Sequence, residues 1–189
     1  MLGEIDRLAR ILSAYDSSSE FSRWNRTRNA PKIVSPELFE VLSLFDQWRE
    51  RTGGALDPAA MAAIEVWKRA AADRRMPSEM ELASARTAVR GAHWRLDSTN
   101  RTATRLSATP LILNSFTKLY IAGKAAEKAR GVSGVVVNIG GDIVVRGRID
   151  EAVRVADPRN DAEGAPAAIR SDPAVIRAYL GTDDEATGQ

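Results

Sequence analysis

The sequence predicts an α+β fold, in which a twisted and mainly antiparallel sheet carries packed helices. Three observations support this prediction: helical patterns dominate the first half, short strand-like runs follow, and one more helical pattern precedes two valine-rich runs near residue 140. Helices and strands that come in separate blocks are typical of α+β proteins. The chain has 189 residues, 44% of them hydrophobic and 28% charged, which is ordinary globular composition.

The first half is predicted to form a series of helices. Apolar residues at helical spacing predict a short helix over residues 4–15. The strongest pattern covers residues 35–52, where Ser35 can cap the helix and Pro36 occupies its first position. An alanine-rich helix over residues 58–75 follows. We expect the helices of 35–52 and 58–75 to pack on the sheet.

Two more helices flank a pair of short strands. Residues 78–91 begin with Ser78 and Glu81 at the spacing of a capping box. The runs "HWRLD" and "TATRLS" are strand-like and are joined by a polar turn. A helix over residues 114–131 follows, although Gly123 weakens it by about 1 kcal/mol relative to alanine.

The aromatic and imidazole side chains are interpreted as structural. His93, the single histidine, is expected to be a packed or surface residue. All four tryptophans occupy apolar positions and are interpreted as core residues, namely Trp24, Trp48, Trp67 and Trp94.

The stretch "VVVNIGGDIVVRG" places Asn138 and two glycines between two β-rich runs. The glycines with Asp142 are a hairpin turn signal, and the pattern by itself favours a simple turn. The alternative is a ligand loop, because glycine lets a backbone approach a ligand closely. The unbroken apolar run Val135–Val137 indicates a strand covered on both faces, where a polar neighbour needs a partner.

Composition excludes several classes of protein. There are no cysteines, so a disulfide scaffold, a thiolate zinc site and a cysteine nucleophile are excluded. The formal net charge is +2 with acids and bases interspersed, and we expect no nucleic-acid partner. No apolar run approaches the ~18 residues of a transmembrane helix, and the N-terminus lacks the pattern of a signal peptide.

Three segments, in the same order, resemble the FAD:protein FMN transferase (ApbE-type) family. "VNIGGDIVVRG" is similar to the family's Asn-x-Gly-Gly-Asp-Ile segment, which also ends in glycine. "TGGALDP" resembles the family's T-G-G-A-F-D-P, and "LSAYDSSSEFSRWNR" resembles its serine-rich segment through Ser13, Tyr15, Ser19, Phe21, Ser22 and Asn25. The resemblance covers residues 5–147.

The resemblance implies that FAD is the substrate and that its FMN half is transferred to a threonine of a target protein with the help of Mg²⁺. Lys118 is then the expected catalytic residue, directed toward phosphate. Tyr15 is expected beside the flavin ring, although it could instead pack against Leu12. The residues that the resemblance assigns to binding of the flavin nucleotide are Tyr15, Thr117, Asn138, Gly140, Gly141 and Asp142. The metal ligands are unknown.

Several positions depart from the family pattern "L-D-x-G-G-I-A-K-G-Y-A-x-D", which corresponds to "LILNSFTKLYIAGK". Ile112 replaces the first aspartate, Leu119 replaces a glycine and Gly123 replaces the last acid. After Gly147, we find no counterpart of the family's metal-binding Asp and Thr. The alternative function is therefore a flavin-binding module of the same fold that has lost turnover.

The chain is expected to be an incomplete family member. We expect an ApbE-like domain over residues 1–156, and a loop, a short helix and a polar tail over residues 157–189. Family members are often periplasmic proteins or membrane-anchored lipoproteins, but no signal peptide is recognised in this chain. Without the usual ligands, Mg²⁺ is expected to bind weakly, at about millimolar concentration.

Overall fold

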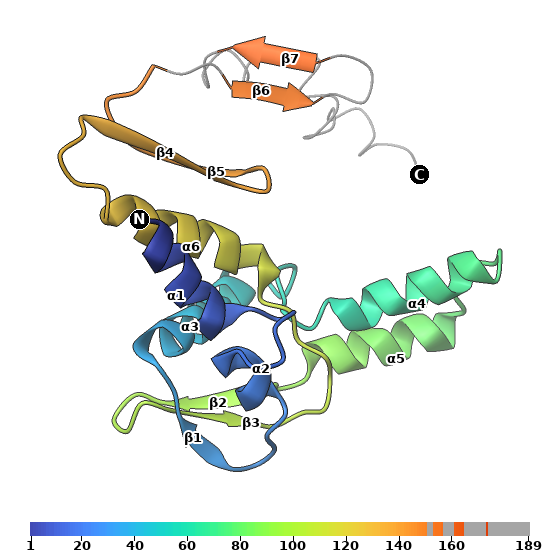
Figure 1. Cartoon of the computed structure of the whole chain (residues 1–189). Helices are drawn as coiled ribbons and strands as arrows, with labels where there is room; N and C mark the ends of the chain where they lie inside the picture. Colours follow the sequence, from blue (N-terminus) through green and yellow to red (C-terminus); the bar gives the residue numbers. More distant parts are fainter. Residues whose placement is uncertain (151–152, 157–160, 165–172, 174–189) are drawn as a thin grey trace. The chain divides into compact units, whose positions relative to one another are not determined.

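The computed structural model describes residues 1–150, 153–156, 161–164 and 173, and the chain divides into two compact units (Figure 1). The first unit comprises Met1–Val132 and Val136–Val145. The second contains Ser133–Val135 and the chain from Arg146 onward.

Six helices and seven strands form in the described ranges. The helices are α1 (Leu2–Leu12), α2 (Glu20–Asn25), α3 (Pro36–Arg51), α4 (Met61–Ala72), α5 (Glu79–Arg90) and α6 (Asn114–Glu127). The strands are β1 (Pro31–Ile33), β2 (Trp94–Asp97), β3 (Thr102–Arg105), β4 (Gly134–Ile139), β5 (Asp142–Gly147), β6 (Val153–Ala156) and β7 (Asp161–Gly164).

The strands are divided among three small sheets. A three-stranded antiparallel sheet has the order β1-β3-β2, with Pro31 opposite Thr104 and Trp94 opposite Arg105. Strands β4 and β5 form a second sheet, and β6 pairs antiparallel with β7 to form a third. The α+β class and the antiparallel pairing are confirmed. As expected, β4 and β5 lie in one sheet, but among the described residues that sheet has only these two strands. The helices expected on it pack elsewhere, α3 against the three-stranded sheet and α4 on α5.

The starts of α3 and α5 follow from local sequence, as predicted, whereas α4 begins at Met61, three residues after the predicted start. Ser35 Oγ accepts a hydrogen bond from the Leu38 amide at 3.2 Å. Ser78 and Glu81 form the complete capping box, in which each side chain bonds the other residue's backbone amide. These contacts satisfy amides that have no partner inside the helix and so stabilise its first turn.

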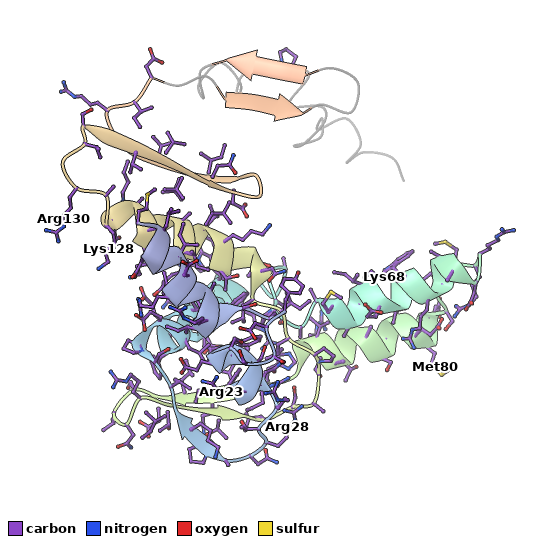
Figure 2. The ribbon with its side chains drawn as sticks, in the orientation of Figure 1. Arg23, Arg28, Lys68, Met80, Lys128 and Arg130 are labelled. Carbon is purple, nitrogen blue, oxygen red and sulfur yellow. The ribbon has the colours of Figure 1, made fainter. Side chains whose placement is uncertain are left out.

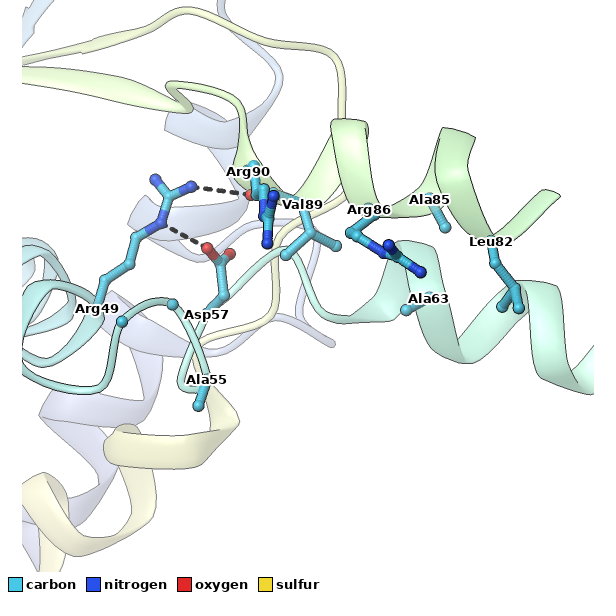
Figure 3. A pocket seen from close by; sticks show the side chains of 11 residues that line it. Arg49, Ala55, Asp57, Ala63, Leu82, Ala85, Arg86, Val89 and Arg90 are labelled. Carbon is cyan, nitrogen blue, oxygen red and sulfur yellow. Dashed lines mark hydrogen bonds and ion pairs between the residues drawn. The ribbon is translucent and has the colours of Figure 1, made fainter. Parts of the chain in front are cut away.

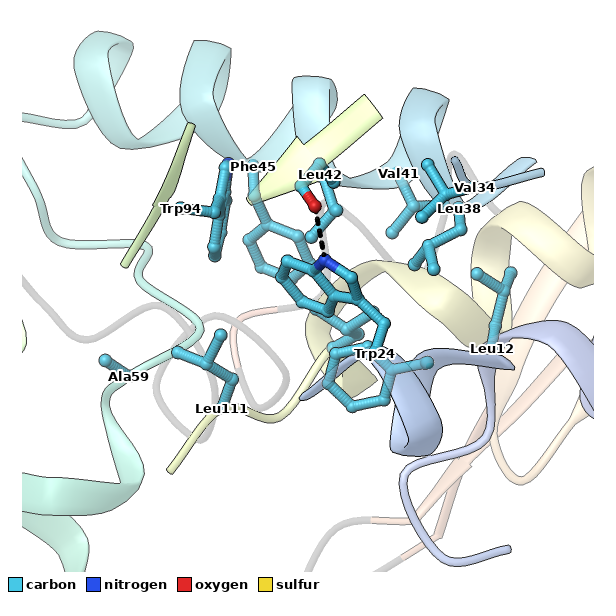
Figure 4. Close-up of a cluster of buried hydrophobic side chains, with 13 residues drawn as sticks. Leu12, Trp24, Val34, Leu38, Val41, Leu42, Phe45, Ala59, Trp94 and Leu111 are labelled. Carbon is cyan, nitrogen blue, oxygen red and sulfur yellow. Dashed lines mark hydrogen bonds between the residues drawn. The ribbon is translucent and has the colours of Figure 1, made fainter. Parts of the chain in front are cut away.

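The core of the first unit lies between α3 and the three-stranded sheet (Figure 4). Its members include Leu38, Val41, Leu42 and Phe45 of α3, together with Leu12, Phe21, Trp24, Val34, Ala59, Trp94, Ala103, Leu111 and Leu113. The indole nitrogen of Trp24 donates to the Ala103 carbonyl at 3.0 Å, which ties α2 to β3. Phe116 of α6 meets Phe45 edge-on, with 4.5 Å between ring centroids.

Two of the four tryptophans are not core residues. Trp24 and Trp94 are buried as predicted, but the prediction is wrong for Trp48 and Trp67, which are 40% and 48% exposed. Trp67 lies on the α4–α5 hairpin, which extends from the rest of the first unit and carries exposed side chains such as Lys68 and Met80 (Figure 2). The two helices of this hairpin pack against each other along one face, and the opposite face of each helix is exposed to solvent.

Strand β4 is covered on one face only. Val137 is buried, whereas Val136 is 38% exposed and Asn138 is exposed. The expectation of a strand covered on both faces is therefore wrong. Side chains alternate between the faces of a strand, and Val137 lies on the covered face while Val136 and Asn138 share the exposed one. Its polar residue is on the open side.

The region after residue 156 was predicted to be loop, but β7 lies within it. The predicted short helix and the polar tail lie outside the described residues, apart from residue 173. Among the described helices, none has the length and apolar character needed to cross a membrane.

Candidate functional site

The turn after α1 is built from serine hydrogen bonds. Ser13 Oγ accepts the Tyr15 amide at 3.1 Å, and the Ser13 carbonyl accepts the Ser19 hydroxyl at 2.6 Å. Ser19 Oγ in turn accepts the Ser22 amide at 3.0 Å and caps α2. The spacing of these serines thus fixes a turn, and it leaves the Tyr15 side chain 83% exposed.

Tyr15 is joined to the first residue of α6. Its hydroxyl oxygen accepts a hydrogen bond from Nδ2 of Asn114 at 2.7 Å. The ring therefore has a fixed end at its hydroxyl group and a free face in solvent. Tyr15 does not belong to the buried core cluster that contains Leu12.

Lys118 lies one helical turn after Asn114, on the same face of α6. Its Nζ is 3.8 Å from Oδ2 of Asp142, at the start of β5, and both side chains are more than one-third exposed. Exposed ion pairs of this kind contribute little to stability. Thr117, which precedes Lys118, is buried.

The β4–β5 turn explains the polar residue in the valine-rich run. Gly140 and Gly141 have positive φ angles of 60° and 94°, which favour glycine. Asn138 Oδ1 accepts the Gly141 amide at 3.0 Å, so the asparagine closes the turn. A Cβ atom on Gly140 would lie 3.5 Å from Lys118 Nζ, whereas one on Gly141 would meet open space.

The structure therefore brings most of the predicted residues together in the first unit. We call Tyr15, Asn114, Lys118, Gly140 and Asp142 the α6 site. Asn138 and Gly141 complete its turn. Thr117 shares the helix but is buried rather than exposed on this face. The contact between Asn114 and Tyr15 was not predicted, because it joins segments 99 residues apart.

The "TGGALDP" segment contributes a buried ion pair that sequence reasoning missed. Asp57 Oδ1 accepts the Ala59 amide at 2.7 Å, and Arg49 Nε lies 2.6 Å from Oδ2. That oxygen has no hydrogen bond of ordinary geometry, so the ion pair alone balances its charge. Arg49 also donates to the carbonyls of Val89 and Gly91, at 2.9 and 3.0 Å. Arg49 thus joins the end of α3 to the Asp57 loop through the ion pair and to the end of α5 through the two hydrogen bonds.

A second buried polar network surrounds His93. Its Nε2 lies 2.9 Å from the Val89 carbonyl, which can only accept, so this nitrogen carries a proton. Its Nδ1 lies 2.9 Å from Ser107 Oγ, to which Arg105 donates. Burial lowers the pKa of His93 below 6.5, and it lowers the pKa of Arg105 to about 10 with a smaller contribution from Arg28. His93 is packed, as predicted.

Buried Arg105 holds together segments that are far apart in sequence. Its Nε donates to Asn25 Oδ1 at 2.9 Å and its Nη1 to the His93 carbonyl at 2.8 Å, and it also bonds the Thr109 carbonyl. Asn25, a residue of the serine-rich segment, therefore has a structural partner. No pattern in "TATRLS" distinguishes this buried arginine from an exposed one.

The described residues do not fit a magnesium centre. No group of three or more His, Cys, Asp or Glu side chains suited to a metal ion occurs in this part of the chain. In the α6 site, Asp142 is the single carboxylate, and it faces Lys118. Mg²⁺ prefers a shell of oxygen ligands and often keeps waters. A single carboxylate whose charge is already balanced by a lysine would bind it weakly.

Comparison with known proteins identifies the ApbE family over residues 1–177. No curated protein matches the chain. The similar solved structures include the following three. Flavinyl transferase ApbE of Pseudomonas stutzeri, in its apo form, has 21% identity and a TM-score of 0.66 over 87% of this chain and 56% of that one. Flavin transferase ApbE of Vibrio cholerae has 22% identity and a TM-score of 0.67 over 86% and 58%. The ApbE protein of Thermotoga maritima has 23% identity and a TM-score of 0.68 over 85% and 55%.

At these identities the likeness shows a shared fold. The chain spans between 55% and 58% of the length of these three proteins.

Proposed function

Because the chain belongs to the ApbE family, we propose that it takes FAD as its substrate and transfers the FMN half to a threonine of a target protein. This proposal rests on the α6 site. There Lys118 of α6 lies beside the glycine turn, and the exposed Tyr15 is hydrogen-bonded to the first residue of α6. The similar structures from Pseudomonas stutzeri and Vibrio cholerae are named as flavin transferases, which supports the same substrate class.

Tyr15 is suited to one wall of a flavin site. An aromatic ring that is mostly exposed in a protein without ligand can stack on the planar isoalloxazine and bury apolar area on both partners. The hydrogen bond from Asn114 fixes the ring at its hydroxyl end, so less side-chain entropy is lost when the flavin binds.

Lys118 is suited to a phosphate. Its contact with Asp142 is long and exposed, so exchanging this partner for a phosphate oxygen has a small energetic cost. An ammonium group beside the reacting phosphate stabilises the negative charge that accumulates during phosphoryl transfer.

The glycine turn allows a ligand to approach the backbone closely. Gly141 has open space where a side chain would be, and Asn138 holds the turn in its shape. A nucleotide can therefore approach the turn backbone, with the Asp142 carboxylate available to a polar edge of the ligand.

In the proposed reaction, the threonine oxygen attacks the phosphorus of the FMN half, and the bond from this phosphorus to the AMP oxygen breaks. AMP leaves, and the threonine proton passes to solvent. Mg²⁺, which the family resemblance implies, would neutralise phosphate charge when bound. Within the α6 site, Lys118 supplies positive charge to the phosphate.

A second function, flavin binding without turnover, is favoured by specific departures from the family pattern. Ile112 stands where an acid is expected, and its amide donates to the Pro58 carbonyl at 2.9 Å, which ties this position to the loop before α4. Gly123, in the interior of α6, supplies no acid either. These changes remove charge from the site and leave the tyrosine and the turn intact.

The two functions are separated by incubating the protein with FAD, Mg²⁺ and an acceptor protein that contains a threonine, and then weighing the acceptor. The transferase predicts a mass gain of one FMN, which an acceptor with Thr→Val at the modified position does not show. Retained FAD binding with no mass gain would support the binding module. Absence of both would contradict both functions.

A further inference from the structure

A pocket of the first unit lies between the loop that follows α3 and the helix α5 (Figure 3). Its volume is about 410 Å³. We call it the arginine pocket, because Arg49, Arg86 and Arg90 line it together with the Gly53–Asp57 loop and an apolar wall. None of the residues of the α6 site lines it, so it is separate from the proposed flavin site.

Two guanidinium groups in this pocket have no partner. Arg86 and Arg90 are exposed, and neither makes an ion pair or a hydrogen bond within the described part of the chain. They lie four residues apart on α5, where like charges are neighbours and repel each other. A bound anion with several oxygens would relieve this repulsion and contact both groups.

The negative groups nearby are already neutralised. Arg49 pairs with Asp57 and donates to the Val89 and Gly91 carbonyls, which would otherwise present the negative end of α5 to the pocket. The lining contains three arginines and one carboxylate, so its net charge is +2. The surplus resides on Arg86 and Arg90.

The rest of the lining is apolar and small. Ala63, Leu82, Ala85 and Val89 form a wall beside the two arginines. We propose that the arginine pocket binds a phosphate monoester whose organic part is a small apolar or aromatic group. The doubly charged phosphate takes one guanidinium fork from each arginine, and the organic part covers the alanine and leucine side chains.

Calorimetric titration with phenyl phosphate tests this assignment at a pH of about 7.5, where the phosphate is mostly doubly charged. The expected result is binding at one site, weaker in more concentrated salt and tighter than binding of inorganic phosphate, which cannot use the wall. Phenol is expected not to bind. The double variant Arg86→Gln/Arg90→Gln should weaken phenyl phosphate binding at least about tenfold, because it removes both charge-assisted contacts.

The matched control is Arg10→Gln/Arg130→Gln, which removes the same charge from exposed arginines that do not line the pocket. Its affinity should equal that of the wild type. The variant Arg86→Lys/Arg90→Lys keeps the charge but loses the planar forks, and it should show intermediate affinity. The proposal is overturned if the wild type does not bind phenyl phosphate, if the glutamine pair binds as the wild type does, or if the control loses as much affinity.

Discussion

The hydroxyl of Tyr15 and the side-chain amide of Asn114 form a hydrogen bond of 2.7 Å that connects the turn after α1 to the beginning of α6. This contact fixes the orientation of an exposed ring next to the helix that carries Lys118. It links the serine-rich segment to the lysine segment, two regions that were recognised separately in the sequence.

Loss of this hydrogen bond should weaken FAD binding. Asn114→Ala removes the donor and Tyr15→Phe removes the acceptor while it keeps the ring, so each should cost about 0.5–1.5 kcal/mol of affinity. The double variant should be no worse than either single variant, because both remove the same contact. Fluorescence titration of all four proteins with FAD measures this coupling. Fully additive losses would show that the bond has no part in binding.

Lys118→Ala should weaken binding of FAD and leave binding of riboflavin unchanged, because riboflavin has no phosphate. A hydrogen bond to a charged group contributes about 1.5–3 kcal/mol, so the FAD affinity should fall by roughly tenfold or more. Lys128→Ala, which removes an exposed lysine just after α6, is the matched control. If riboflavin and FAD lose equal affinity, Lys118 does not contact the phosphates.

Local features of the fold could be predicted from sequence, and features that depend on distant contacts could not. The caps at Ser35 and Ser78 were predicted because a cap involves residues three apart. The exposure of Trp67 was missed, since it depends on the α4–α5 hairpin extending from the rest of the unit. A helical apolar pattern is the same whether or not a partner covers it.

The candidate site shows the same division. The glycine turn was predicted from a motif that is readable in one sequence, and Lys118 became a candidate through its resemblance to a family segment. The structural roles of Asp57 and Arg105 were not predicted, because their partners Arg49 and Asn25 lie elsewhere in the chain. The role of Asn138 in closing its own turn is local, and an asparagine three residues before a glycine amide is the signal that could have revealed it.

Arg49→Ala should destabilise the protein strongly. The substitution leaves the buried Asp57 carboxylate without its countercharge and removes two hydrogen bonds to the end of α5. Removing one partner of a buried pair typically costs about 3–5 kcal/mol, and the partial exposure of Arg49 puts the expected loss at the lower end of that range. Urea denaturation of this variant, compared with Arg90→Ala, measures the difference. Equal stability of the two variants would contradict a structural role for the ion pair.

Stability should depend on pH through His93. Burial lowers its pKa in the folded protein below the unfolded value of 6.5, with Asp57 opposing and Arg49 and Arg105 reinforcing this shift. The unfolded state therefore takes up the proton first as pH falls. The contribution of neutral His93 is complete above pH 6.5 and declines as pH falls below that value toward the folded pKa.

His93→Gln should reduce the dependence of the unfolding free energy on pH just below 6.5, whatever it does to the stability at higher pH. Chemical denaturation at several pH values gives the slope of the unfolding free energy against pH for the wild type and for the variant. An identical slope in wild type and variant would show that His93 keeps an ordinary pKa in the folded state.

FAD titration of wild type, Gly141→Val and Asp142→Ala, followed by tryptophan quenching, tests most directly whether the glycine turn belongs to a flavin site. Gly131→Val is the matched control, because it also places a branched residue at positive φ in open space. We predict that Gly141→Val abolishes binding, that Asp142→Ala loses about 1–3 kcal/mol of affinity, and that Gly131→Val binds as the wild type does. Equal FAD affinity in all four proteins would mean that the loop is only a hairpin turn and would contradict the proposed site.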